Sequence, residues 1–290
     1  MNIFTLQGMP KMNPVDILLN RRLLCVFAKL ASFFTVILFC LPAYAATTDV
    51  VYDLKDFNSL HIKGSMKVYF VQSNIFSVRV TANKEQHSRT ELSVLGKALI
   101  VQQRPKSCWG LFSNDLICIG WSSSQDDFPV KVYASAPRLI EAHLEGSGSL
   151  SIGELVAENL DLKVSGSGTI NRANVKGSNV LIAISGSGDI DVKNVKAESL
   201  KVSIIGSGDV KVNRLEATTA ETEISGSGDV TLSGVLTSQS ISITGSGDFL
   251  GQQLIVDESD VEIRGSGDVS LLSGGVLHAD VKGSGDIKIE

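Results

Sequence analysis

The chain has 290 residues and a net charge of −5, with 26 Lys and Arg against 31 Asp and Glu. Nothing in this balance suggests a nucleic-acid partner, and the length fits one elongated domain or two compact ones. Hydrophobic residues make up 43% of the chain but aromatic residues only 6%, and glycine occurs 27 times. Such a composition is typical of many short strands joined by tight turns.

The first 45 residues have the three parts of a secretory signal peptide in order. A basic region ends at Lys29, an apolar run follows over residues 30–41, and the small-residue site Ala43-Tyr44-Ala45 comes next. The apolar run is shorter than the ~20 residues that a membrane-spanning helix needs, which favours cleavage after Ala45 over an uncleaved membrane anchor. The sequence therefore predicts an exported protein, either periplasmic or extracellular at the cell surface, with no membrane insertion after signal removal.

Cleavage also makes the chain more acidic. The leader carries four basic residues against one acidic residue, so the net charge of −5 becomes about −8 in the mature chain. An exported protein with this charge is not expected to bind anionic membranes through electrostatic attraction.

Residues 46–145 are predicted to form irregular coils of β-structure that also cap the open end of the repeat that follows, because an uncovered sheet edge invites polymerisation. Alternating apolar residues predict short strands over residues 59–71, which bend at Gly64-Ser65, and over 77–82, 98–102 and 130–134.

An insertion without clear periodicity interrupts this part over residues 104–128. It holds both cysteines of the mature chain, both tryptophans and Phe112: Cys108, Trp109, Phe112, Cys118 and Trp121. In an exported protein two nearby cysteines predict a disulfide, and the alternative of a metal site lacks a second Cys or His pair. The aromatic residues predict a binding site, with closure of the end of the core as the alternative.

A Gly-Ser-Gly phrase recurs eight times from Gly146 to the end of the chain, at intervals of 18 to 20 residues. Its first glycines are Gly146, Gly166, Gly186, Gly206, Gly226, Gly245, Gly265 and Gly283. A constant period of about 20 residues is the signature of a solenoid. Within one period, apolar residues alternate as in strands with one inward face; in one coil they are Ile190, Val192, Val195, Ala197, Leu200, Val202 and Ile204. Residues 146–290 therefore predict an all-β fold, a single-stranded right-handed parallel β-helix with glycine corners.

The residue after each Gly-Ser-Gly phrase is always short and polar. These residues are Ser149, Thr169, Asp189, Asp209, Asp229, Asp248, Asp268 and Asp286. All of them carry a side-chain oxygen that can accept a hydrogen bond from a nearby backbone N–H group. The prediction is turn capping without a cofactor, and calcium binding by the column of aspartates is the alternative.

The segments YDLKDFNSLHIKGSMKVYFVQS (Tyr52–Ser73) and VKVYASAPRLIEAHLEGSGSL (Val130–Leu150), followed by repeated GSGD, resemble the putative auto-transporter adhesin, head GIN domain family (DUF2807). The resemblance covers residues 50–290 and implies an exported, β-helical, adhesin-like protein without established enzymatic activity. It supplies no catalytic residues, and the insertion with its cysteines and tryptophans departs from the family's pattern.

Catalytic motifs such as G-x-S-x-G, H-E-x-x-H or a P-loop do not occur, and the histidines are far apart in sequence. The predicted function is that of a non-enzymatic adhesin-like or scaffold protein with a cell-surface, glycan or protein partner. The alternative is a polysaccharide-active β-helix lyase or hydrolase, with Arg172, Arg214 and Arg264 as candidate members of a charged face. Arg172 stands where neighbouring coils have an apolar residue, which predicts a bulge or an outward side chain.

Overall fold

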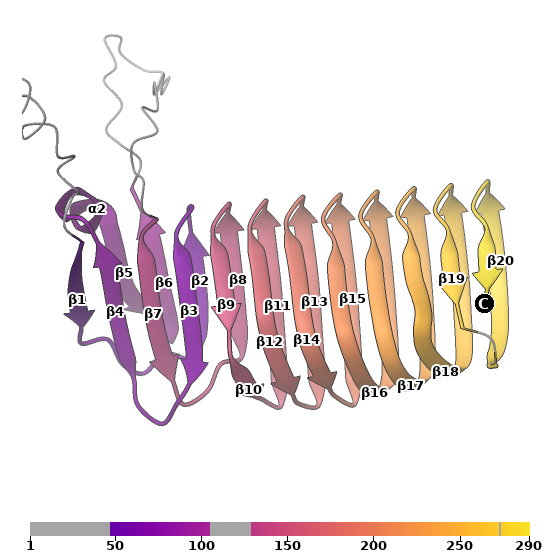
Figure 1. The fold of residues 1–290 in the computed structure, drawn as a ribbon, viewed down its shortest axis with the longest axis horizontal. Coiled ribbons are helices and arrows are strands. Elements are labelled where there is room, and N and C mark those ends of the chain that lie inside the picture. The colour runs from indigo at the N-terminus through magenta and orange to yellow at the C-terminus, as the bar shows by residue number, and fades with distance from the viewer. Residues whose placement is uncertain (1–46, 105–128, 273) are drawn as a thin grey trace, which may run out of the picture. The chain divides into compact units, whose positions relative to one another are not determined.

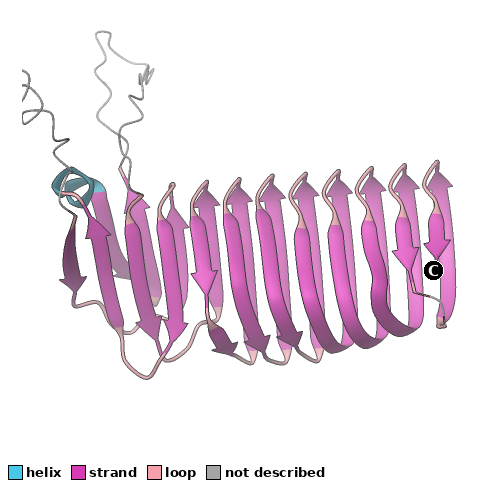
Figure 2. Cartoon of the chain, in the orientation of Figure 1, coloured by secondary structure: helices cyan, strands magenta, loops and turns pink. Residues whose placement is uncertain are grey.

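The computed structural model describes residues 47–104, 129–272 and 274–290. This part of the chain is almost entirely β-structure, with one short helix, α2 (Lys84–Arg89) (Figure 2). No helix within these ranges is long and apolar enough to cross a bilayer. The strands are β1 (Thr48–Tyr52), β2 (Ser59–Lys63), β3 (Lys67–Gln72), β4 (Ser77–Ala82), β5 (Thr90–Leu95), β6 (Ala98–Gln103), β7 (Lys131–Ala136), β8 (Glu141–Gly146), β9 (Ser149–Ile152), β10 (Glu154–Val156), β11 (Asn159–Gly166), β12 (Thr169–Lys176), β13 (Asn179–Gly186), β14 (Asp189–Lys196), β15 (Ser199–Gly206), β16 (Val210–Gly226), β17 (Val230–Gly245), β18 (Phe249–Gly265), β19 (Val269–Leu271), β20 (Val276–Gly283) and β21 (Ile287–Ile289).

Strands of successive coils pair in parallel, one repeat apart. Leu160 of β11 is the register partner of Val180 of β13, which in turn pairs with Leu200 of β15. The first glycines of the corners pair in the same way, so that the corners form one row along the edge where β11, β13 and β15 end (Figure 1). The prediction of a parallel β-solenoid with coils of about 20 residues is confirmed.

Each coil consists of two strand runs that enclose the core. One run contains β2, β8, β11, β13 and β15, and the other contains β3, β9, β12 and β14. In the later coils β16, β17 and β18 each contribute to both runs, because the chain stays in strand conformation around the corner opposite the glycines. Outward side chains of the same offset therefore form columns across the coils.

The interior is mainly aliphatic, although three phenylalanines (Phe57, Phe70 and Phe249) and a few polar side chains such as Gln239 and Ser259 are also buried. In the coil that begins at Gly186, Ile190, Val192 and Val195 are buried on one strand, and the next strand buries Leu200, Val202 and Ile204. Ala197 lies at the corner between them and is only partly buried. Each fully buried side chain of this size contributes about 1.5–3 kcal/mol relative to exposure, and the same slots recur in every coil.

Arg172 lies in a β-bulge and has a φ of +68°. Its side chain is exposed, and Ala173 occupies the buried slot in its place. The extra residue disturbs the register between β12 and β14 only locally, since the pairing resumes at Asn174.

The N-terminal strands extend the same stack, but in a different order from the chain. β3 pairs in parallel with β9 on one side and with β7 on the other, and β2 lies between β8 and β6. Beyond this coil, β4 pairs antiparallel with β7, β1 with β4, and β5 with β6. The switch to antiparallel pairing, together with α2, ends the regular coil at this side (Figure 1).

Candidate functional site

The predicted insertion site lies outside the described residues. Cys108, Trp109, Phe112, Cys118 and Trp121 all fall between residues 105 and 128, so the disulfide and the aromatic binding site stay predictions. The flanking strands are described: β6 ends at Gln103 and β7 begins at Lys131. In the neighbouring coil, the equivalent connection between β2 and β3 is the bend at Gly64. The insertion therefore joins β6 and β7, and their register partners β2 and β3 are joined by the bend at Gly64.

The six aspartates among the predicted capping residues form a hydrogen-bonded ladder between coils. One carboxylate oxygen of each aspartate accepts from the backbone N–H of the aspartate in the next coil, over distances of 3.3, 3.0, 2.9, 2.8 and 3.0 Å from Asp189 to Asp286. The donor thus belongs to the next coil and not to the same turn, because parallel stacking places equivalent residues one rung apart. The described residues include no group of three or more His, Cys, Asp or Glu side chains suited to a metal ion.

Two tyrosines stack on the outer face of the β3–β7 pair. Tyr69 and Tyr133 are register partners, and their ring centroids are 5.0 Å apart with an interplanar angle of 13°. The guanidinium of Arg79, on β4, lies 4.5 Å from the centre of the Tyr133 ring and also pairs with Asp49, Nη1 to Oδ2, at 3.0 Å. The register continues from Tyr69 to Ser151 on β9. The ring face of Tyr69 that is turned away from Tyr133 therefore looks over a small side chain.

A polar groove open to solvent begins at this free ring face. It runs across β9, β12, β14 and β16 and is lined by Lys67, Tyr69, Ser149, Ser151, Asn171, Arg172, Asp191, Lys193 and Asn213. Short side chains, Ser149 and Ser151, line it next to Tyr69, and longer side chains such as Arg172 and Lys193 line it further along. Asp191 is the single carboxylate among these residues, so the two carboxylates of a typical glycosidase are not present in this lining.

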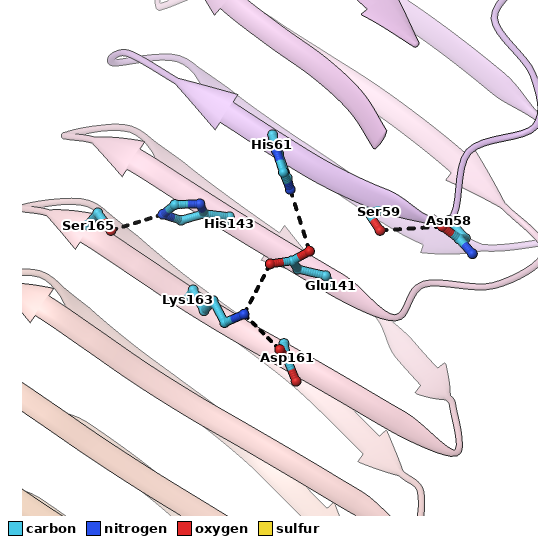
Figure 3. Close-up of polar contacts among 8 residues, drawn as sticks. All are labelled: Asn58, Ser59, His61, Glu141, His143, Asp161, Lys163 and Ser165. Carbon is cyan, nitrogen blue, oxygen red and sulfur yellow. Dashed lines mark hydrogen bonds and ion pairs between the residues drawn. The ribbon is translucent and has the colours of Figure 1, made fainter. Parts of the chain in front are cut away.

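A second polar cluster lies on the outer face of the other strand run (Figure 3). Glu141 of β8 is 3.5 Å from Nε2 of His61 and 3.1 Å from Nζ of Lys163, measured to its two carboxylate oxygens. Lys163 also contacts Asp161 at 2.7 Å. The rings of His61 and His143 meet edge to face at 5.9 Å, and Nε2 of His143 is 2.9 Å from the Ser165 hydroxyl.

Sequence separation conceals this cluster, although a local signal for it exists. The phrases HIKGS, from His61, and HLEGS, from His143, have the same form, with the histidine three residues before the glycine of the corner. Because the corners stack in one row, equal offsets place the two rings in register. The two histidines, which are far apart in sequence, are therefore neighbours in the structure.

The cluster gives the stability of the fold a pH dependence. Burial of His143, and secondly the neighbouring His61, hold the pKa of His143 below its ordinary value of 6.5. Burial alone would raise the pKa of Glu141, but its hydrogen bond from Lys163, with smaller contributions from the charges of Lys163 and from His61, outweighs this and leaves the pKa below the ordinary value of 4.5. Both shifts mean that the unfolded chain binds protons more readily than the folded protein, so acid destabilises the fold.

Replacement of His143 by glutamine is expected to reduce the acid sensitivity of folding. In the wild type, the contribution of His143 is complete above pH 6.5 and is lost as the pH falls towards its lower folded pKa. The urea midpoint should therefore drop less for His143→Gln than for the wild type between about pH 7.5 and pH 5.5, a window that stays above the titration of Glu141. The exposed His278 provides the matched control, His278→Gln, and an equal drop in all three proteins would contradict this assignment.

Comparison with solved structures shows which proteins share this fold. The chain is similar to a putative adhesin from Parabacteroides distasonis (TM-score 0.72, 16% identity, 85% of this chain and 98% of that chain covered) and to one from Parabacteroides merdae (TM-score 0.67, 16% identity, 85% and 97% covered). It is also similar to a protein from Parabacteroides distasonis described as a putative lipid binding protein (TM-score 0.62, 18% identity, 85% and 98% covered). At these identities the likeness shows the fold alone, and none of the three is named as an enzyme.

The family comparison covers nearly the whole described part of the chain. A search of curated proteins found no match. In contrast, the family model described as "Putative auto-transporter adhesin, head GIN domain" matches twice, over residues 56–193 and 180–290. The two matches meet within the repeat, as expected for a solenoid whose coils are alike. The chain belongs to the head GIN domain family of auto-transporter adhesins, DUF2807.

Proposed function

We propose that this protein is an exported, non-enzymatic, adhesin-like protein that binds a carbohydrate on the outer face of β3, β7, β9 and β12. The observation that carries the proposal is the stack of Arg79, Tyr133 and Tyr69, which ends at an open groove. An aromatic face beside hydrogen-bonding side chains suits a sugar ring, because the apolar face of the sugar packs on the tyrosine while its hydroxyls meet polar groups.

The groove supports binding in preference to catalysis. Ser151 and Asn171 are already hydrogen-bonded to each other at 2.9 Å, and Asn213 donates to Asp191 at 2.8 Å. These contacts hold the lining in place, which lowers the entropy cost of binding. The alternative of a polysaccharide-active enzyme predicts product release, so an increase in reducing ends or in unsaturated products during incubation with a bound polysaccharide would contradict the proposal.

Export is supported by the signal-like leader and by membership of an auto-transporter adhesin family. The expected mature N-terminus is Ala46, since cleavage after Ala45 fits the small-residue site. Expression of the full chain in a Gram-negative host, followed by mass spectrometry of the periplasmic and extracellular fractions, tests this. Recovery of the protein only in the cytoplasm with its leader intact would refute it.

Replacement of Tyr69 by alanine is expected to weaken carbohydrate binding about tenfold, because the open ring face of the stack is lost. The matched control is Val71→Ala, since Val71 lies on the same strand and face and is 58% exposed. A glycan array identifies a ligand for the full chain, and titration with that ligand compares the variants. Binding that survives Tyr69→Ala but disappears on deletion of residues 105–127 would move the site to the insertion.

A further inference from the structure

We infer that the ligand of this groove is an acidic polysaccharide and that Arg172 binds its carboxylates. This inference rests on the proposed function and names the chemical class of the ligand. It is argued from the backbone conformation of Arg172, from the charges around it and from the pattern of the repeat.

The backbone at Arg172 is strained in a way that the core does not require. A φ of +68° is unfavourable for a residue with a Cβ atom. The equivalent strand of the next coil fills its inward slot with Val192, whose φ is not positive. The bulge in β12 places Arg172 on the outer face, in the groove lining. Bulges commonly redirect a side chain in this way near functional sites.

The cations of the groove have no partners in the described part of the chain. Arg172, Lys67 and Lys193 line the groove, and their side chains make no ion pair or hydrogen bond with any described residue. By contrast, Lys163, Lys196 and Lys201 on other surfaces each contact a carboxylate. Three cations against the one carboxylate of Asp191 make the groove electropositive on a protein that is acidic as a whole.

The repeat itself removes negative charge at this place. From Gly186 onwards an aspartate follows every Gly-Ser-Gly phrase, but two of the coils that the groove crosses, those of β9 and β12, have Ser149 and Thr169 at that offset. Ser149 pairs with Lys67 on one side and with Thr169 on the other. An aspartate here would repel an anion and pair with the lysine. The neutral residues leave the cations available to a ligand.

These features fit a chain of sugar rings that bear carboxylates. One ring packs on the free face of Tyr69 above Ser151, and a carboxylate of a following ring reaches the guanidinium of Arg172. Arginine presents a planar fork that matches a carboxylate through two parallel hydrogen bonds. Lys67 and Lys193 add attraction at longer range, which predicts that affinity falls as salt rises.

The test compares two forms of one polymer. Isothermal titration of the full chain with polygalacturonate and with its fully methyl-esterified form separates charge from sugar shape. We expect binding of the free acid at least tenfold tighter than binding of the ester, and weakened by salt. Equal affinity for the two forms would overturn the inference while leaving carbohydrate binding in place. If the protein binds neither polygalacturonate nor alginate, the inference is also overturned.

Variants of Arg172 separate binding from folding. Arg172→Gln should weaken binding to polygalacturonate about tenfold, whereas Arg138→Gln, which removes an exposed positive charge outside the groove, should change it less than twofold. Arg172→Gly should weaken binding equally while raising the melting temperature by about 2–4 °C, because glycine accepts the positive φ. Normal binding by Arg172→Gln together with loss in Tyr69→Ala would refute the role of Arg172 but not the proposed function.

Discussion

Replacement of Gly206 by alanine is expected to lower the free energy of unfolding by about 3–5 kcal/mol. Gly206 has a φ of +130°, which is unfavourable for any residue with a Cβ atom. A Cβ atom there would also overlap the backbone carbonyl oxygen of Gly186 in the preceding coil. That carbonyl accepts the N–H of Ser207 at 2.8 Å, so it cannot move aside without breaking the bond that joins the two corners.

Two other glycines separate the causes of this loss. Gly96, in the turn between β5 and β6, has a φ of +56° but no atom within 4 Å of an added Cβ, so Gly96→Ala should cost only about 1 kcal/mol. Gly153 has neither a positive φ nor a closer neighbour than the carbonyl oxygen of Phe70 at 3.8 Å, so Gly153→Ala should be nearly neutral. Urea titration followed by circular dichroism compares the three variants. Similar midpoints for Gly206→Ala and Gly153→Ala would contradict the stacking of the corners.

The second large effect is expected in the core, at Phe249 and Gly251. Phe249 is the single aromatic residue after Gly146. Its register partners in the adjacent coils are the smaller residues Val230 and Val269. Gly251 pairs with Leu271, and a Cβ atom on Gly251 would lie 2.7 Å from Cε1 of Phe249. The large ring thus occupies space that a leucine takes in the next coil.

A double-mutant cycle measures this exchange of volume. Phe249→Val leaves a cavity and should cost about 2–4 kcal/mol, and Gly251→Leu alone overpacks the core and should cost about 1–3 kcal/mol. The double variant recreates the valine and leucine of the next coil, so its free energy of unfolding should return to within about 1 kcal/mol of the wild type. If the two losses simply add in urea titrations, the ring does not occupy the space beside Gly251.

The solenoid was predictable because its signals are local and repeated. Each corner phrase marks the same point of a coil, and the alternation between corners assigns the inward face. The parallel register then follows, since any slip would bring a side chain onto a corner glycine and its neighbouring carbonyl. The bulge at Arg172 was also visible as a break in this pattern.

The cap was less predictable because it lacks the repeat. β1 lies at an exposed edge and shows no inward and outward alternation, and α2 has six residues, too few for a helical period. A capping box marks the start of α2: Asn83 accepts from the backbone N–H of Gln86, and the side chain of Gln86 accepts from that of Asn83. This short signal alone does not distinguish a helix from a turn.

The tyrosine stack depends on an order of strands that differs from the order of the chain. β7 follows β3 by about sixty residues in sequence, yet β3 lies between β7 and β9 in space. Neither the sequence separation of Tyr69 and Tyr133 nor the alternation of apolar and polar residues around them indicates this order of strands. The groove depends on it as well, because its first wall is the face of Tyr69 that β7 leaves open.

Because the coils pair residue by residue, the length of the solenoid can change independently of the groove. Each coil contacts only the coil before and the coil after it, so adding or removing one complete period between Ser199 and Gly265 leaves the contacts of β3, β9 and β12 unchanged. Every added period of about twenty residues lengthens the stack by one strand spacing, about 4.8 Å. Duplication of coils can therefore change the length of the solenoid during evolution without changing the ligand that its first coils recognise.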